Sequence, residues 1–521
     1  MTSVDRPDAV VIGSGPNGLT AATLLGRAGW SVTVLEGNDV AGGAIASEAL
    51  TAPEYVHDTF SAFYGILHES PVFHELELAR RVEWATFDIP VAATVRPGSV
   101  GLCHADPAQT AKGLGLFDPG DEARWLELCA WWEKIGRHFF AMTTAPVGSL
   151  APLLKLVTAT RLKRGVELAQ LMLAPMEVAA AQLLRSDVGR SLVSSGASHA
   201  DLSVASSGSA PGAIILALAA QMRNMPVPVG GAGRLAEAWV ASATDAGAQV
   251  VTGAKVERVV VERGRAVGVE TTDGRSFRAR RAVLADCHAT KLFGPGGLVS
   301  QDDLPATFLD ALSWFRPGSG VFKLDVALDA PAPWSDAGLD RTGVVHIVGS
   351  TADMVRASGE VGAGLLPTEP MLIVGQQTVA DPTRAPAGGH TLWIETHVPG
   401  RPREGSWAEL SDRFRDRVLD RIESYAPGLR EHIVGDAVHT PPDLEARNPN
   451  LVGGDLAGGS ISLHQQLVFR PARGWFRYNS PVKGLYLCSA SAHPGGGVHG
   501  LVGRNCARRV LGRSLSRRAS T

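Results

Sequence analysis

A glycine-rich turn near the start of the chain has the spacing of a dinucleotide phosphate loop. The turn GSGPNG occupies residues 13–18 and follows an apolar run, DAVVI, at residues 8–12. In this spacing Gly13 allows a tight turn, Gly15 lets the backbone approach a pyrophosphate, and Gly18 lets the following helix pack on the strand. The first amides of that helix then face the phosphates. The pattern predicts a nucleotide site, although the motif alone also occurs in structural turns.

An acidic residue stands where the nucleotide ribose is expected. Glu36 ends a second β-branched run, residues 31–35. A carboxylate in this place accepts hydrogen bonds from ribose hydroxyls and disfavours a 2′-phosphate. Because strand, turn, helix and acid follow one another in register, we favour nucleotide binding over a purely structural turn.

A glycine pair downstream distinguishes FAD from a nicotinamide dinucleotide. Gly42 and Gly43 follow Glu36 with the spacing E-x(5)-GG, which resembles the extended FAD signature of glutathione-reductase-like flavoproteins. The resemblance implies a loop that folds over the pyrophosphate and the ribityl chain. Ala44 stands where many relatives carry arginine, which removes one charge-assisted contact. FAD is therefore the expected cofactor, and since no second GxGxxG occurs, a stably bound nicotinamide is not expected.

A second glycine-rich loop near the C-terminus is the other candidate flavin contact. GLYLC at 484–488 predicts a buried strand, and SASAHPGGGVHG at 489–500 leads into a helix expected to end near residue 511. Free amides at a helix N-terminus stabilise negative charge on a reduced flavin. His493 and His499 flank the triple glycine and could bond the flavin or move a proton. A role in stabilising the loop is equally open for both.

Other polar side chains are weaker candidates for catalysis. His57 and Asp58 follow the FAD loop, where a structural contact is favoured over a place beside the flavin. Arg470 could hold a polar end of the substrate or pair with an acid. Flavin dehydrogenation requires a positioned C–H bond and exclusion of water rather than an obligatory base. The catalytic side chains therefore stay unknown, with His57, His493 and His499 as candidates.

The composition is that of a globular enzyme and argues against a nucleic-acid-binding, metal-binding or membrane-spanning protein. A chain of 521 residues exceeds one hydrophobic core, and a net charge of −3 offers no basic field for nucleic acid. The five cysteines are scattered, without CxxC pairs or zinc spacing, so we expect no metal site and a reducing, cytoplasmic location. No segment is apolar enough to predict a transmembrane span.

We expect an α/β fold with a glutathione-reductase-like, FAD-binding Rossmann domain and a discontinuous α+β substrate domain. The FAD-binding domain is expected in three segments, 1–75, 226–300 and 446–521. A helical substrate or cap domain would occupy 76–225, and a second sheet 301–445. The apolar faces of the cap are expected to form core, with a lipophilic tunnel or a membrane-touching face as the sharper alternative.

Several elements of this fold have their own sequence signals. Residues 230–233 form a turn that opens a helix, 250–261 predict one strand, and 283–285 rejoin the main sheet after an antiparallel meander. The FAD fold implies that Val256, at the start of the meander, pairs its backbone with adenine. In the substrate domain we expect strands at 320–328 and 392–398 and a polar helix at 406–425.

Taken together, these motifs resemble a known enzyme family. GSGPNG, Glu36 with its glycine pair, and GLYLCSASAHPGGGVHGLVGRNCA look like the phytoene-desaturase-related FAD-dependent oxidoreductases. TPPDLEARNPN at 440–450 and HQQLVFRP at 464–471 are similar to the branch that contains carotenoid ketolases and pyridine nucleotide-disulfide oxidoreductase domain-containing protein 2. Two departures, Ser489 to Ser491 in place of a Gly-Ala-Gly-like loop and His464 in place of an acid, leave the substrate in doubt.

The resemblance implies a dehydrogenase, desaturase or ketolase-like enzyme that moves hydride from a lipophilic substrate, such as an isoprenoid or carotenoid, to flavin N5. Dioxygen or a quinone would be the diffusible electron acceptor. An amine-oxidase-like flavoenzyme and a non-catalytic lipid-binding or regulatory protein of the same fold are alternatives, and peripheral membrane contact stays open. The residues assigned to FAD are Gly13, Ser14, Gly15, Pro16, Asn17, Gly18, Glu36, Gly37, Gly42, Gly43, Ala44, Val256, Ser489, Gly496, Gly497 and Val498.

Overall fold

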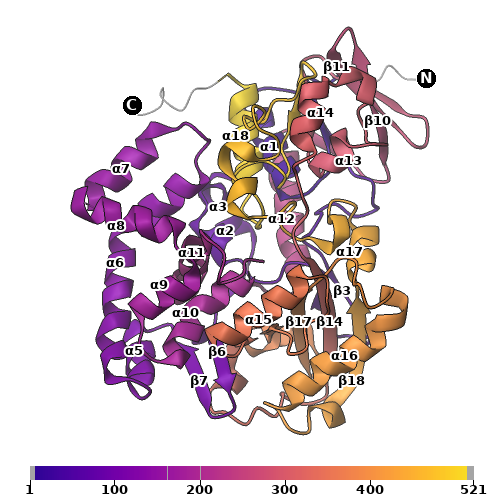
Figure 1. The fold of residues 1–521 in the computed structure, drawn as a ribbon. Helices are drawn as coiled ribbons and strands as arrows, with labels where there is room; N and C mark the ends of the chain where they lie inside the picture. The colour runs from indigo at the N-terminus through magenta and orange to yellow at the C-terminus, as the bar shows by residue number, and fades with distance from the viewer. Residues whose placement is uncertain (1–5, 161, 200, 513–521) are drawn as a thin grey trace.

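The computed structural model describes residues 6–160, 162–199 and 201–512. The outermost residues of the first and last predicted FAD segments, 1–5 and 513–521, lie outside this range. A five-stranded parallel sheet and a seven-stranded mixed sheet organise the chain. Figure 1 shows the parallel-sheet region at the top, the large sheet below it and a group of helices at the left.

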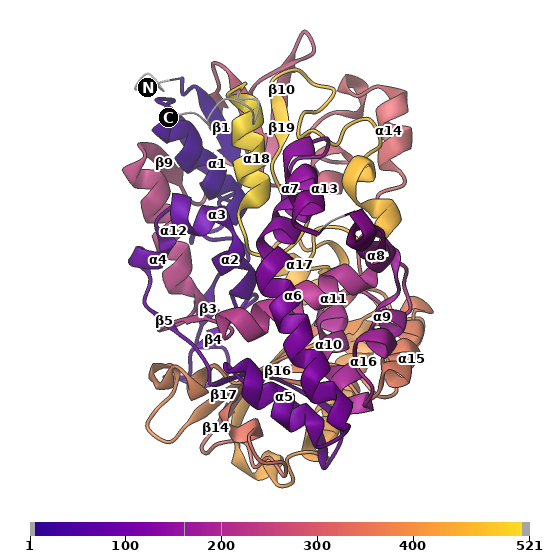
Figure 2. The ribbon, with the colours of Figure 1, turned by 90° about the vertical axis from the view of Figure 1, so that its left-hand side faces the viewer.

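The parallel sheet has the order β19-β13-β1-β2-β9 and confirms the predicted Rossmann-like fold. Its strands are short, and four of the five are largely apolar and buried, as expected for a parallel sheet covered on both faces. Figure 2 shows α1 and α18 side by side, although they begin the first and end the last segment of this domain. The strands are β1 (Ala9–Ile12), β2 (Val32–Leu35), β9 (Ala248–Val251), β13 (Ala282–Ala285) and β19 (Leu485–Leu487), and the helices that pack with them are α1 (Pro16–Arg27), α12 (Ala232–Asp245) and α18 (Leu501–Val510).

The single strand predicted at 250–261 is wrong. The chain forms β9, which joins the parallel sheet beside β2, and then β10 (Val256–Glu262), which starts the antiparallel meander with β11 (Arg265–Thr271) and β12 (Ser276–Arg278). Between them Gly253 adopts a φ of 57°, which glycine tolerates. The run of β-branched residues did not reveal this break because both strands share the same composition.

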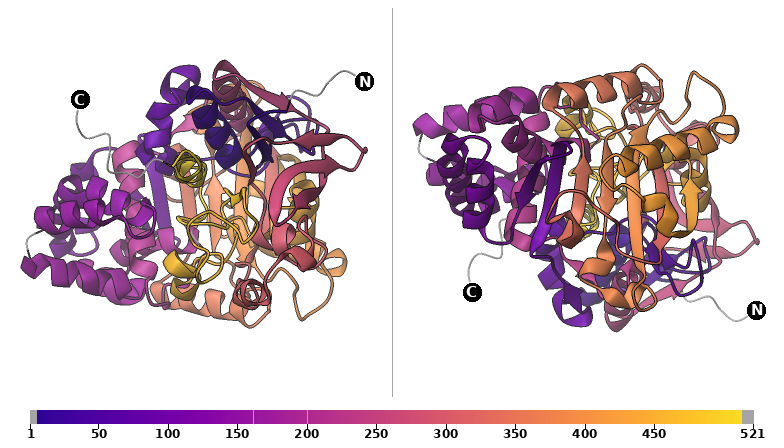
Figure 3. Two further views of the ribbon diagram at one scale, coloured as in Figure 1. Left: turned by 90° about the horizontal axis from the view of Figure 1, so that it is seen from above. Right: turned by 90° about the horizontal axis from the view of Figure 1, so that it is seen from below.

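The seven-stranded sheet has the order β18-β14-β17-β16-β15-β6-β7. The strands predicted at 320–328 and 392–398 are confirmed as β14 and β17, but β6 and β7, which lie in the predicted helical segment 76–225, were missed. One face of the sheet packs on α16 (Trp407–Glu423), the predicted polar helix, which Figure 3 shows lying across the strands from below. The strands are β6 (Ile89–Arg96), β7 (Ser99–Cys103), β14 (Gly320–Leu328), β15 (Thr342–Ile347), β16 (Leu372–Gly375), β17 (His390–Val398) and β18 (Ile433–His439).

A helical cap covers the β6–β7 end of the opposite sheet face. Helix α10 contacts both β6 and β7, and α11 packs on α10. The cap helices are α5 (Pro107–Gly115), α6 (Pro119–Thr144), α7 (Leu150–Thr160), α8 (Leu162–Leu173), α9 (Met176–Leu183), α10 (Asp187–His199) and α11 (Ser209–Arg223). Shorter elements complete the chain: β3 (Ser47–Glu48), β4 (His57–Asp58), β5 (Trp84–Ala85), β8 (Val227–Pro228), α2 (Gly65–Glu69), α3 (Pro71–Glu75), α4 (Leu78–Arg81), α13 (Ala289–Phe293), α14 (Ala306–Leu312), α15 (Thr351–Gly362) and α17 (Pro441–Arg447).

Candidate functional site

The phosphate loop between β1 and α1 requires its glycines. Gly13 has a φ of 90°, and a Cβ on Gly18 would lie 2.3 Å from the Gly13 carbonyl oxygen. Helix α1 begins after Gly15, which has no side chain to cap the helix, so the Asn17 amide is left to face an anion, whereas the Gly18 amide donates to Asp286. Pro16 at the first helical position has no amide to satisfy. The loop therefore offers backbone donors and no bulk where a pyrophosphate is expected.

Two separate motifs of the sequence, Glu36 and the Gly42–Gly43 pair, contact this loop. The Glu36 carboxylate accepts from the Ser14 amide at 3.0 Å and from the Ser14 hydroxyl at 2.6 Å. The Gly42 amide donates to the same hydroxyl at 3.2 Å. A Cβ on Gly43 would lie only 2.9 Å from the Cα of Gly15, so the glycine pair is required where the two loops meet.

The C-terminal motif lies against the N-terminal one. The Gly503 amide in α18 donates to the Asn17 side chain in α1 at 3.2 Å, and a Cβ on Gly503 would collide with the Asn17 carbonyl oxygen at 1.9 Å. A Cβ on Gly496 would likewise lie only 2.6 Å from the Cα of Ala457. Val498 packs on the core of the parallel sheet. The contacts bring the first and last predicted FAD segments together, although their motifs are separated by most of the chain.

The segment that contains Val256 also reaches this loop cluster. The Ala254 amide donates to the Glu36 carbonyl oxygen at 2.7 Å, and Val256 then opens β10. A Cβ added to Gly37 would lie 3.6 Å from the Cα of Lys255, so the two segments are in contact. The pairing of Val256 with adenine stays a prediction, and its position next to the ribose-binding acid is consistent with it.

A buried acid at the phosphate loop had no sequence signal. Asp286 follows β13, and its carboxylate accepts from the Gly18 amide at 2.8 Å. A Cβ on Gly15 would come within 2.7 Å of the same carboxylate. Burial raises the pKa of Asp286 to about 7, with a further contribution from nearby Glu36. The side chain is therefore a group whose protonation state can change beside the phosphate loop near neutral pH.

The structure gives the candidate histidines of the C-terminal loop structural partners. His493 Nε2 lies 2.9 Å from the carbonyl oxygen of Ala145, at the end of α6, and ties this loop to the cap. His499 Nδ1 accepts from the Leu501 amide at 3.1 Å. Burial lowers the pKa of both rings to about 4, so both are neutral at physiological pH. These contacts support the loop-stabilising interpretation of each.

The side chains of Asp58 and Arg470 also form hydrogen bonds with backbone groups. Asp58 accepts from the Ala232 amide at 2.7 Å and so caps α12, the helix that the predicted turn opens. The Arg470 guanidinium is fully buried and donates to carbonyl oxygens of the 457–460 loop and of Ala490. The suggested pairing of Arg470 with an acid is not found, since its hydrogen bonds within the described residues go to backbone carbonyl oxygens, and its role in holding a substrate stays a prediction.

The large sheet carries a buried cluster of charged residues that the sequence analysis did not predict. Lys323 and Asp325 lie on one face of β14 and bond each other, and Nδ1 of His57, the third candidate histidine, lies 3.5 Å from Asp325. Glu395 on β17 is directly opposite Lys323, and His439 on β18 is opposite it on the other side. The cluster lies where the first FAD segment meets the large sheet.

The cluster retains unused bonding capacity. Burial raises the pKa of Glu395 to about 8, so this carboxyl is protonated at neutral pH. Glu395 Oε1, Asp325 Oδ1 and His439 Nδ1 have no hydrogen-bond partner within the described ranges. Charged residues at alternate positions of apolar strands, in GVFKLDVAL and TLWIETHV, were the signal that could have identified it, because buried charges are rare without a function or a partner.

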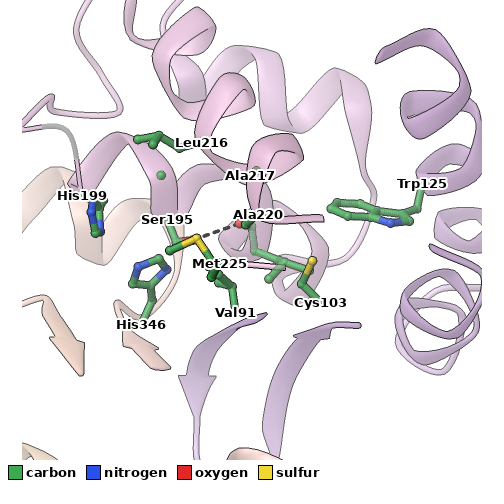
Figure 4. Close-up of a pocket in the computed structure, with 12 residues that line it drawn as sticks. Val91, Cys103, Trp125, Ser195, His199, Leu216, Ala217, Ala220, Met225 and His346 are labelled. Atoms are coloured by element: carbon green, nitrogen blue, oxygen red, sulfur yellow. Dashed lines mark hydrogen bonds between the residues drawn. The ribbon is translucent and has the colours of Figure 1, made fainter. Parts of the chain in front are cut away.

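A cavity lies between the cap and the large sheet. Its walls come from α10, α11, β6, β7 and β15, and its residues are apolar except for a few side chains. Figure 4 shows the rings of His199 and His346 on one side of the cavity and Trp125 at the far end. No acidic residue of the described chain is part of its lining. Across the described part of the chain, no three His, Cys, Asp or Glu side chains gather as a metal site.

Comparison with known proteins identifies the family. Residues 17–511 match the family described as flavin-containing amine oxidoreductase. The chain belongs to this family. Among curated relatives, pyridine nucleotide-disulfide oxidoreductase domain-containing protein 2 of Rattus norvegicus is 30% identical over 97% of this chain and 93% of its own. A limonene dehydrogenase component of Castellaniella defragrans and hydroxyneurosporene desaturase of Cereibacter sphaeroides are each 26% identical, over 98% of this chain and over 95% and 99% of their own.

Solved structures agree on the fold of this chain. Putrescine oxidase bound to putrescine aligns with a TM-score of 0.60 at 16% identity, over 97% of this chain and 99% of its own. The RAB GDI of Plasmodium falciparum aligns with a TM-score of 0.52 at 11% identity, over 97% of each chain. The predicted phytoene-desaturase-like resemblance, the fold and FAD as cofactor are confirmed.

The glycine cradle fits the flavin cofactor of the family. Backbone donors at the start of α1, the acid at the end of β2 and the close approach of Gly43 to Gly15 are what a dinucleotide needs at this edge of a parallel sheet. The protein is therefore an FAD-dependent oxidoreductase, and the non-catalytic alternative is set aside. None of the helices in the described ranges is both long and apolar enough to cross a membrane.

Proposed function

We propose that this oxidoreductase dehydrogenates a lipophilic, isoprenoid-type molecule, in a desaturase or ketolase-like reaction. The observation that carries the proposal is the apolar cavity between cap and sheet, which can receive one end of such a molecule and whose described lining contains no acidic residue to balance a cationic group. Relatives over nearly the whole chain are named as a limonene dehydrogenase component and a hydroxyneurosporene desaturase. A substrate with a terpene-like skeleton is consistent with the apolar cavity and with the names of these relatives.

FAD, when bound, supplies the hydride acceptor at flavin N5. The chain itself excludes water and orients the substrate, because cap helices α10 and α11 close over the β6–β15 part of the sheet face. The buried Lys323 and Glu395 can hold a proton within the same face of the sheet, at Nζ and at the unpartnered Oε1. Dioxygen or a quinone would then take the electrons.

One observation keeps amine oxidation as the second candidate. Phe63 and Trp393 form an edge-to-face pair with ring centroids 6.0 Å apart, and Lys323 Nζ lies 5.8 Å from the Trp393 ring centroid. Paired aromatics of the kind that guide an amine are not evident from the sequence. The fold is also shared with putrescine oxidase, so amines belong in the test.

We also propose that the cap contacts a lipid bilayer, which is where an isoprenoid-type substrate would be dissolved. Large apolar side chains on α7, α8 and α9 are exposed, among them Leu154 at 62% and Leu173 at 64%. The segment 463–469 continues this surface, because Gly208 bonds Leu173 and lies against Leu463. A contiguous exposed apolar surface is typical of an interaction site.

The proposed function is tested by anaerobic reduction of the bound flavin. The purified, FAD-loaded protein is mixed with limonene, geraniol, a carotenoid in detergent, or putrescine, and flavin bleaching is recorded. We expect bleaching by one or more terpenoid compounds and none by putrescine. Bleaching by the amine alone would replace the proposal by the second candidate.

A further inference from the structure

Two histidines are among the few polar side chains that line the cavity between cap and sheet. His346, on β15, is 5% exposed, and neither of its ring nitrogens has a hydrogen-bond partner among the described residues. The ring of His199, at the end of α10, lies edge-on to that of His346, with the two centroids 5.8 Å apart and an angle of 63° between the ring planes. Figure 4 shows both on the same side of the cavity.

Both imidazoles are neutral at physiological pH. Burial lowers the pKa of His346 to about 3 and that of His199 to about 4. A neutral imidazole offers one donor and one acceptor, and a buried polar group without a partner is costly. Since the described chain leaves both nitrogens of His346 unpaired, a ligand that bonds them recovers this energy.

The chemistry of the cavity selects among ligands. A pure hydrocarbon leaves both ring nitrogens of His346 unpaired, and an ammonium group would enter an apolar cavity whose described lining holds no acidic partner. A hydroxyl or carbonyl oxygen bonds a neutral imidazole and costs little to desolvate by comparison with a charge. The cavity measures about 40 Å³, which is room for a head group rather than a whole isoprenoid.

The register of the large sheet relates this cavity to the buried charged cluster. His346 is opposite Ile373, Ile373 is opposite Glu395, and Glu395 is opposite Lys323. Directly opposite residues share a face of the sheet, and neighbouring strands are about 4.8 Å apart. His346 therefore lies about 10 Å from Glu395 along one sheet face, two strand spacings away, a distance that an extended isoprenoid chain spans.

We propose that His199 and His346 form a subsite for the neutral oxygen group, hydroxyl or carbonyl, of an elongated lipophilic ligand. The inference rests on the proposed function and names its substrate class: an oxygenated terpenoid is preferred to the hydrocarbon of the same skeleton. The same chemistry fits a quinone, so the ligand is either the oxygenated substrate or the electron acceptor.

Calorimetric binding to the FAD-loaded full chain tests the subsite without turnover. The probes are geraniol, the hydrocarbon 2,6-dimethyl-2,6-octadiene and a short-chain ubiquinone. We expect H346F and H199F to weaken binding of geraniol, of the quinone or of both by about 5- to 30-fold and to leave the hydrocarbon unchanged. H346Q should restore part of the affinity, because its amide again offers a donor and an acceptor, and H74F, on the exposed surface of α3, is the control.

The two half-reactions then identify the source of the oxygen group. Slower anaerobic flavin reduction by geraniol in H346F identifies the substrate, and slower reoxidation of reduced flavin by the quinone identifies the acceptor. Equal loss of hydrocarbon and oxygenated probes, or unchanged affinities in both phenylalanine variants, would overturn the subsite. Selective binding without flavin reduction by any terpenoid would contradict the proposed function and leave the subsite standing.

Discussion

The protonation state of the Asp286 carboxyl affects the stability of the folded protein at the phosphate loop. Its carboxyl is buried against Gly13, Gly15 and Gly18, where it accepts from the Gly18 amide. The folded protein holds the proton up to a pH of about 7, whereas an unfolded chain releases it near the ordinary value of 3.8. The folded state therefore binds more protons between these values, and stability falls as the pH rises through this window.

We expect D286N to remove this loss of stability. The asparagine amide oxygen still accepts from Gly18 but the side chain cannot ionise, so the variant should gain roughly 4 kcal/mol over the parent protein at pH 8 and only about 1–2 kcal/mol at pH 5. Thermal unfolding of FAD-loaded protein from pH 5 to pH 9 measures the difference. Parallel curves for parent and variant across this range would show that Asp286 is already ionised in the folded state.

Residue by residue, the sequence predicted what local backbone geometry requires. Gly13 and Gly43 have positive φ and short approaches that no side chain tolerates, so their spacing, together with the flanking strand, helix and Glu36, revealed the cofactor loop. Glu395 and His346 could not be found in this way. Their functional neighbours come from strand register across β15, β16, β17 and β14, which depends on the whole sheet rather than on adjacent residues.

At the scale of elements, one buried arginine joins three parts of the chain. Arg384 donates to Asp58 on β4 at 2.5 Å, to Asp381 at 2.8 Å and to the Pro228 carbonyl oxygen before α12 at 2.7 Å. Asp58 in turn caps α12. The first two FAD segments and the large-sheet segment therefore share one fully buried ion network.

We expect R384M to destabilise the folded protein by about 3–5 kcal/mol, because it leaves Asp58 and Asp381 buried without a counter-charge. The matched control is R356M, which removes an exposed pair with Asp353 on α15 and should cost less than about 1 kcal/mol. Thermal unfolding and FAD retention on gel filtration report the two effects. Equal small losses for both variants would show that the buried network carries no net stability.

At the scale of the whole molecule, the cap separates the cavity from the surface proposed to meet lipid. The apolar side chains of α7, α8 and α9 are exposed on the outer side of the same helical group whose α10 and α11 line the cavity. This arrangement predicts that a substrate leaves the bilayer through the cap without crossing water. The sequence predicted a helical cap within 76–225, but the outward apolar face of the cap could not be distinguished from core by periodicity, since both have the same pattern.

The double variant L154D/L173D should therefore lose vesicle binding while it keeps its FAD. Burial of each leucine in a bilayer contributes about 1.5–3 kcal/mol, so we expect at least about a tenfold lower bound fraction on flotation with phosphatidylcholine–phosphatidylglycerol vesicles. The control is V434D. Val434 is about as exposed as the two leucines but lies on β18, at the far edge of the large sheet, so this variant should float like the parent protein. If the cap is the entry route, flavin reduction by a vesicle-borne terpenoid should slow in the double variant, whereas reduction by geraniol in free solution should not. Flotation equal to that of V434D would leave the exposed leucines without a lipid partner and place substrate entry elsewhere on the molecule.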